Sequence, residues 1–118
     1  SKFLLEGCVT YSDAAKVTRL GVKQETLDQF GAVSEQCARE MAEGMRKTSG
    51  ANYAIATTGF AGPDGGTGEN PVGTIYIALA GRGETLVKRV QLFGERARIR
   101  EVASLHAFDL LRRKLCLD

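Results

Sequence analysis

The stretch that decides the fold is residues 53–80, which read YAIATTGFAGPDGGTGENPVGTIYIALA. Two short apolar segments, 53–58 and 73–80, flank a glycine-rich loop, 59–73, that holds six of the fourteen glycines and both prolines. Long loops between core strands are usually functional or mobile. Glycines let backbone N–H groups approach an anion, so the loop is a candidate anion site. The alternative is a flexible connector, since the loop lacks the signatures of a P-loop or a dinucleotide-binding turn.

Helices are expected on either side of these strands. Ser12 and Ser34 are good N-cap residues, and Gly21, Gly31 and Gly50 are placed to end helices. The pattern therefore predicts a strand at 6–12, then helices over 13–20, 23–30 and from Ser34 to just before Gly50.

The remaining chain predicts a hairpin and a long helix. Residues 73–80 and 85–93 read as antiparallel strands joined by a turn at 81–84, and a helix follows over about 95–115. Helices alternating with buried strands are typical of an α/β protein.

Composition excludes several classes of protein. The 118 residues are 43% hydrophobic and 25% charged, which is typical of one globular domain over 1–118. A net charge of +2 disfavours nucleic acid as a partner, and no apolar run is long enough to cross a membrane. The three cysteines are scattered and the N-terminus resembles no signal peptide, so we expect a cytoplasmic protein with neither disulfides nor a metal site.

Several residue pairs could carry chemistry. Tyr11 and Lys16 lie five residues apart where the first strand meets the first helix, and a lysine partly desolvated against a tyrosine can act as a general base. The alternative for Lys16 is an ordinary surface lysine. Thr57 and Thr58 end a strand beside the glycine loop, where their hydroxyls could contact a ligand or satisfy the backbone.

Three arginines, at 96, 98 and 100, lie at the start of the last helix. An arginine near a helix N-terminus is well placed to bind a phosphate group. A solvated basic face is the alternative. His106 is the one histidine, and its position is more typical of a core histidine with its hydrogen bonds satisfied than of a metal ligand or a catalytic base.

Taken together, the motifs resemble one family over nearly the whole chain. They are, in order, Gly7-x-Val-Thr-Tyr-Ser with Lys16, Leu20-Gly21-Val22, Phe30-Gly31-Ala32-Val33-Ser34, Met41-Ala42-x-Gly44, Thr58-Gly59-Phe60-Ala61-Gly62-Pro63-Asp64-Gly65-Gly66 and Pro71-Val72-Gly73-Thr74. The set resembles the C-terminal domain of the competence/damage-inducible CinA proteins, whose single-domain members are nicotinamide-nucleotide amidases.

The resemblance implies a fold and a site. The fold would be a three-layer α/β/α sandwich around a mixed sheet. The activity would be deamidation of nicotinamide mononucleotide to nicotinic acid mononucleotide and ammonia, without metal or other cofactor. Lys16 would be the base that activates a serine, and Tyr11 would orient it or relay the proton. Thr58 and Gly59 would line the substrate site, and Arg96 would hold the nucleotide phosphate.

The sequence departs from the family at its start. The nucleophile belongs to a Glu-Ser-Cys-Thr-Gly-Gly segment that residues 1–118 do not contain. We therefore expect the serine, with the first strand and helix of the domain, upstream of residue 1. Without that segment, the chain is expected to be unstable alone or completed by a partner chain.

Two functions remain open at this point. One is the amidase, and the other is a catalytically silent module that binds the nucleotide or serves in assembly. The resemblance also implies a homo-oligomer, most simply a dimer.

Overall fold

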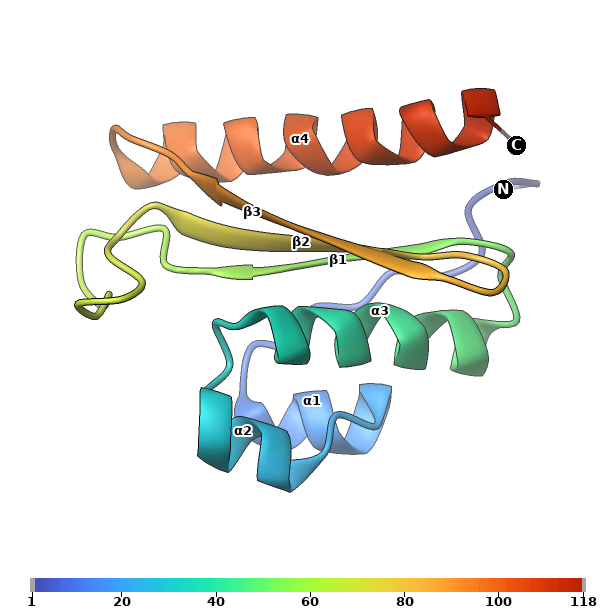
Figure 1. Cartoon of the computed structure of the whole chain (residues 1–118), viewed down its shortest axis with the longest axis horizontal. Helices are drawn as coiled ribbons and strands as arrows, with labels where there is room; N and C mark the ends of the chain where they lie inside the picture. The colour runs from blue at the N-terminus through green and yellow to red at the C-terminus, as the bar shows by residue number, and fades with distance from the viewer. Residues whose placement is uncertain (1, 118) are drawn as a thin grey trace.

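The computed structural model describes residues 2–117 and forms three layers, with helix α4 above a sheet and helix α3 below it (Figure 1). Helices α1 and α2 pack on α3 on the side away from the sheet. The α/β/α arrangement predicted from the sequence is confirmed. In chain order the elements are α1 (Asp13–Leu20), α2 (Gln24–Phe30), α3 (Glu35–Ser49), β1 (Ala54–Gly59), β2 (Thr74–Ala80), β3 (Thr85–Gln91) and α4 (Arg96–Leu117).

The described strands pair in the order β1-β2-β3, and both pairings are antiparallel. The hairpin of β2 and β3 is as predicted. The parallel pairing that a mixed sheet needs does not occur within residues 2–117. Both connections in this part of the chain reverse direction through loops, and parallel neighbours would need a crossover.

The two faces of the sheet bury different side chains. On the face toward α4, Ile75 and Ile77 pack with Ile99 and with the half-buried Ile55. The buried residues between the sheet and α3 are alanines, namely Ala38, Ala42, Ala78 and Ala80, with the half-buried Ala56, Tyr76 and Val87 packed against them. Successive residues of a strand point to opposite faces, so this contrast fixes which side chains of β1 face which helix layer.

Local signals set the helix ends as predicted. The Ser12 hydroxyl accepts a hydrogen bond from the Ala15 N–H at 3.1 Å, and Gly21 ends α1 with φ 71°. The Ser34 hydroxyl likewise caps α3 by accepting from the Cys37 N–H at 3.1 Å. These bonds satisfy N–H groups that a helix leaves without intrahelical partners.

Helix α3 lies close against the end of α1 at Gly44. A Cβ atom built on Gly44 would overlap the carbonyl oxygen of Leu20. Glycine is therefore required here by close backbone approach. This contact sets how closely the end of α1 packs on α3.

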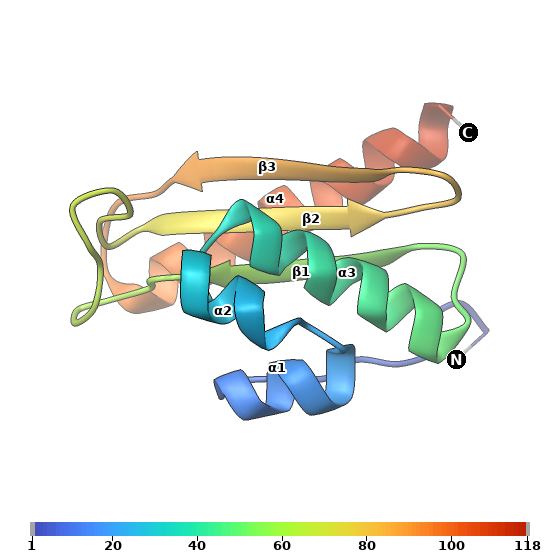
Figure 2. The same cartoon turned by 60° about the horizontal axis from the view of Figure 1, so that its bottom comes forward.

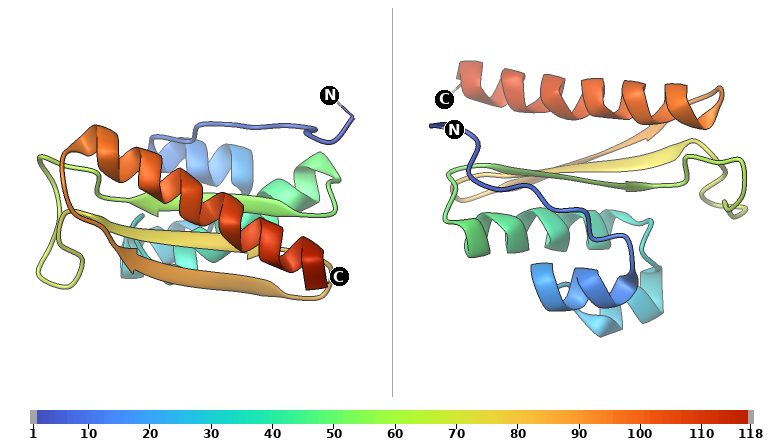
Figure 3. Two further views of the ribbon diagram at one scale, coloured as in Figure 1. Left: turned by 90° about the horizontal axis from the view of Figure 1, so that it is seen from above. Right: turned by 180° about the vertical axis from the view of Figure 1, so that it is seen from behind.

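The strand predicted over 6–12 is wrong. These residues run along the β1 side of the sheet but belong to no strand, and Glu6 is instead paired with Arg19 of α1 (Figures 2 and 3). Val9 is 89% exposed. The alternation of residue types gave an extended segment, but a strand also needs a hydrogen-bonded neighbour, which local sequence does not specify.

Candidate functional site

A cleft of about 620 Å³ opens between the end of β1 and the first turns of α4. Four of the five residues predicted for the site line it: Tyr11, Thr58, Gly59 and Arg96. They come from three segments that are far apart in the sequence, and only the tertiary fold brings them together. The other lining residues are Thr57, Ala61, Ile75, Ala97, Ile99, Arg100, Glu101, Ala103 and Ser104.

The glycine loop is fixed at the base of this cleft. The Phe60 N–H donates to the Thr74 carbonyl at 3.1 Å, and the Gly73 N–H donates to the Phe60 carbonyl at 2.6 Å. Arg96 donates through Nη1 to the Gly62 carbonyl at 3.0 Å and joins α4 to the loop. The loop is therefore anchored at both ends and at Gly62, unlike a free connector.

Lys16 is the predicted site residue that does not line the cleft. It is 6% exposed, and its Nζ donates to the Thr10 carbonyl at 2.7 Å and to the Tyr11 carbonyl at 3.2 Å. The surface-lysine alternative is therefore wrong. Lys16 is joined to Tyr11 through the main chain, and the Tyr11 side chain is 84% exposed.

The two threonines at the end of β1 point to opposite sides. Thr58 shares the α3 face with Ala56, and its hydroxyl donates to the Ala32 carbonyl at 2.8 Å. Thr57 shares the α4 face with Ile55, so its side chain lies on the cleft side. Sequence reasoning singled out Thr58 as a substrate contact, but its hydroxyl is used within the protein. Side chains alternate between the two faces of a strand, so Thr57 lies on the same face as Ile55, and this alternation was the signal that would have pointed to Thr57.

The arginines of α4 separate into different environments. Arg96 and Arg100 line the cleft, whereas Arg98 does not, and its side chain approaches Gly94. Arg100, one of the three arginines that the sequence offered as phosphate-binding candidates, lies one helical turn after Arg96 on the same side, although the family resemblance pointed to Arg96 alone. His106 is half-buried on α4 and does not line the cleft.

A buried thiol lies on α3, outside the lining of the cleft. Cys37 of α3 is fully buried, and burial raises its pKa from 9.0 to about 11. The nearby positive charge of Lys16 opposes this rise, and the negative charge of Glu40 adds to it. Cys37 thus stays a neutral thiol at ordinary pH and acts as a small apolar side chain.

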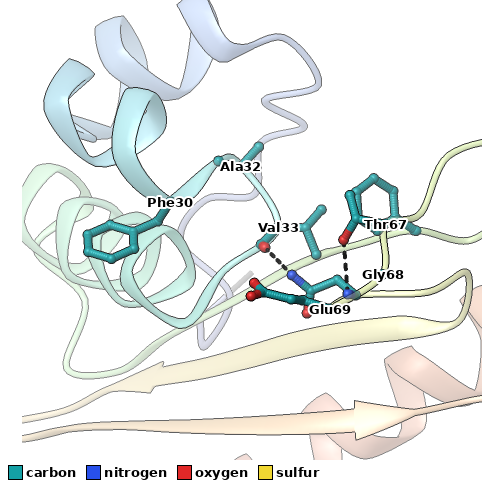
Figure 4. Close-up of a pocket in the computed structure, with 9 residues that line it drawn as sticks. Phe30, Ala32, Val33, Thr67, Gly68 and Glu69 are labelled. Carbon is teal, nitrogen blue, oxygen red and sulfur yellow. Dashed lines mark hydrogen bonds between the residues drawn. The ribbon is translucent and has the colours of Figure 1, made fainter.

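A second hollow, of about 500 Å³, lies between the turn at 30–33 and the far part of the glycine loop (Figure 4). The side-chain amide of Asn70, one of the residues that line this hollow, makes two hydrogen bonds within the protein. It donates to the Val33 carbonyl at 3.3 Å and accepts from the Tyr76 hydroxyl at 3.0 Å. None of the predicted site residues lines this hollow, so the cleft beside α4 is the better candidate site.

Two features are absent from the described part of the chain. Residues 2–117 contain no group of three or more metal-ligating side chains placed to hold an ion. No helix among these residues combines the length and apolar character needed to cross a lipid bilayer.

The fold and the cleft define a class: an α/β/α domain whose cleft lies where a strand end, a glycine-rich loop and the start of a helix meet. The family model described as the CinA C-terminal domain matches residues 1–115. The chain belongs to this family, as its motifs suggested.

Curated relatives agree with this membership. A CinA-like protein of Kosmotoga olearia is 52% identical over 115 residues, which is 98% of this chain and 28% of the relative. A putative competence-damage inducible protein of Clostridium perfringens is 51% identical over the same shares of the two chains. The chain thus spans little more than a quarter of the length of these relatives.

Solved structures share the fold. The competence damage-inducible protein A of Klebsiella pneumoniae superposes with a TM-score of 0.86 at 41% identity, covering 91% of this chain and 66% of that one. A CinA-superfamily protein from another Klebsiella pneumoniae strain gives a TM-score of 0.87 at 38% identity, covering 92% of this chain and 68% of that one.

Proposed function

We propose that this domain is an amidohydrolase that converts nicotinamide mononucleotide to nicotinic acid mononucleotide and ammonia. One observation carries the proposal: Tyr11, the Thr58–Gly59 strand end and Arg96 line a single cleft, and the Lys16 Nζ is hydrogen-bonded to the Thr10 and Tyr11 carbonyls. These are the positions at which the chain resembles nicotinamide-nucleotide amidases.

The proposed reaction is acyl transfer in two steps. A serine hydroxyl attacks the carboxamide carbon and passes its proton to the Lys16 amine, and the tetrahedral intermediate then expels ammonia after that proton reaches the leaving nitrogen. Water hydrolyses the resulting acyl-serine to the carboxylate and restores the hydroxyl. The serine would come from the family's upstream motif, which residues 1–118 do not contain.

Particular features support the assignment of roles. Lys16 is buried and held by two carbonyl oxygens, so its amine has a fixed position. Tyr11 is exposed on the cleft, where its phenol can orient a ligand or relay a proton. Arg96 adds a permanent positive charge at the cleft wall, as an anionic substrate requires.

The test uses the product of the complete reading frame. The purified protein is incubated with nicotinamide mononucleotide, and ammonia and nicotinic acid mononucleotide are quantified. Lys16→Met should abolish turnover, whereas Lys47→Met, at the end of α3, should leave it unchanged. Absence of ammonia release by the unmodified protein, or full activity of Lys16→Met, would overturn the proposal.

A second function, a catalytically silent module, rests on the same cleft, because Arg96 and its neighbours could hold a nucleotide without a nucleophile. A silent module would bind the nucleotide without turnover. Calorimetry should then show binding that Arg96→Ala weakens by about 1.5–3 kcal/mol, typical of a lost hydrogen bond to a charged group. A complete reading frame that encodes the serine motif would favour the amidase.

We also propose that the protein works in the reducing cytoplasm. Cys8, Cys37 and Cys116 are all free thiols, and disulfides are rare in that compartment. Fractionation of cells expressing the protein from its own gene tests this location.

A further inference from the structure

The cleft contains two guanidinium groups that differ in how many of their hydrogen-bond donors are used within the protein. Arg96 uses Nη1 to hold the Gly62 carbonyl of the glycine loop. Arg100 lines the same cleft, is exposed, and its side chain has no hydrogen bond or ion pair with any residue from 2 to 117. One arginine therefore holds the loop, and the other has all five of its N–H donors available.

The helix places the two groups side by side. Residues four apart on a helix lie on the same face, about 5–6 Å apart at Cβ. Ile99 and Ala103 bury the side of α4 that packs on the sheet, and this directs Arg96 and Arg100 along the wall of the cleft. Two planar guanidinium groups at this spacing can bind the oxygens of one phosphate together.

The other charges of the cleft leave a net attraction for anions. Glu101 is the one acidic residue in the described lining, so Arg96, Arg100 and Glu101 sum to +1. The hydroxyls of Tyr11 and Thr57 also belong to the lining and can hydrogen-bond a ribose, whereas the Ser104 hydroxyl donates to the Arg100 carbonyl at 3.1 Å.

We infer that Arg100 is the residue that selects a phosphomonoester substrate, with Arg96 serving mainly to position the glycine loop and secondarily to contact the phosphate. This inference rests on the proposed function, because it names the group that distinguishes the mononucleotide from its riboside. It reassigns the main phosphate contact from Arg96, the residue indicated by the family resemblance, to Arg100.

The experiment compares Arg100→Gln with Arg98→Gln in the product of the complete reading frame. Both variants remove one positive charge from the same part of α4, but Arg98 does not line the cleft. With nicotinamide mononucleotide, Arg100→Gln should raise KM about tenfold or more and change kcat little, as expected for a lost hydrogen bond to a charged group. With nicotinamide riboside, the same variant should behave like the unmodified protein.

Further variants separate binding from folding. Arg100→Lys keeps the charge but not the bidentate geometry, so it should restore part of the lost affinity. Glu101→Gln removes the acidic neighbour and should lower KM for the mononucleotide. Equal losses on mononucleotide and riboside, or equal effects of Arg98→Gln and Arg100→Gln, would overturn the assignment.

A binding measurement distinguishes failure of this inference from failure of the proposed function. If the unmodified protein hydrolyses neither substrate, the amidase proposal fails, and calorimetry with nicotinamide mononucleotide then tests Arg100 directly. Weaker binding by Arg100→Gln but not by Arg98→Gln, with inorganic phosphate competing for the site, supports the inference. Unchanged binding, or no binding by any form, overturns it.

Discussion

Thr58 at the end of β1 and Ala32 in the turn before α3 are joined by a hydrogen bond of 2.8 Å from the threonine hydroxyl to the alanine carbonyl. The two residues are 26 positions apart, so this bond fixes the end of β1 to the turn that leads into α3. Thr58 therefore offers the cleft its backbone, and Thr57 offers a side chain.

Substitution of these threonines should separate their roles. Thr58→Val removes the donor to Ala32, leaves a half-buried carbonyl without its partner, and should lower the free energy of unfolding by about 1 kcal/mol. Thr57→Val is the matched control and should leave stability nearly unchanged. Urea denaturation of both variants checks this, and equal destabilisation would contradict the assignment of faces.

The contact between α1 and α3 predicts a large effect at Gly44. In Gly44→Ala the new methyl group would overlap the Leu20 carbonyl, so the helices must separate, at a cost on the order of 3 kcal/mol. Gly68→Ala is a suitable control, because a Cβ at Gly68 meets no atom within 4 Å. Thermal unfolding should show a clearly lower Tm for Gly44→Ala alone.

The buried thiol predicts selective reactivity. Cys8 and Cys116 are exposed and should react promptly with a thiol reagent near pH 8, whereas Cys37 should react only when the protein unfolds. A Cys8→Ser/Cys116→Ser double variant should then show no fast phase. Three thiols of equal reactivity would show that Cys37 is not protected.

The raised pKa of Cys37 also predicts a pH dependence of stability. The folded thiol keeps its proton up to about pH 11, and the unfolded thiol loses it near 9.0. The folded state therefore binds more protons in this window, and the Cys37 contribution to stability, complete below about pH 9, is lost as pH rises toward 11. Denaturation across this range should show a smaller decline for Cys37→Ala than for the unmodified protein.

Exposed apolar side chains predict self-association. Leu105 and Phe108 are each 62% exposed on α4, and Leu5 and Val9 are 59% and 89% exposed in the segment before α1. Apolar surface of this kind favours a covering partner. The 118-residue chain should therefore sediment as a dimer or larger species at high concentration, and Leu105→Lys with Phe108→Lys should weaken this. A monomer at every concentration would contradict the prediction.

The sequence by itself determined the helix boundaries, the strands around the glycine loop and the family. These depend on information held within a few residues: Ser12 and Ser34 cap helices, Gly21 and Gly50 end them, and the motifs are contiguous. A hydroxyl three residues before an N–H group, or a glycine that adopts a positive φ, acts locally whatever the rest of the chain does.

Only the tertiary structure decided that residues 6–12 find no strand partner among residues 2–117, that Lys16 is buried, that Thr58 faces α3, and that Arg100 shares a cleft with Arg96 and Tyr11. Each of these depends on how layers formed by residues tens of positions apart pack on one another. Local sequence does not encode those contacts, because the same extended or helical segment can present a side chain to a core, to a cleft or to water.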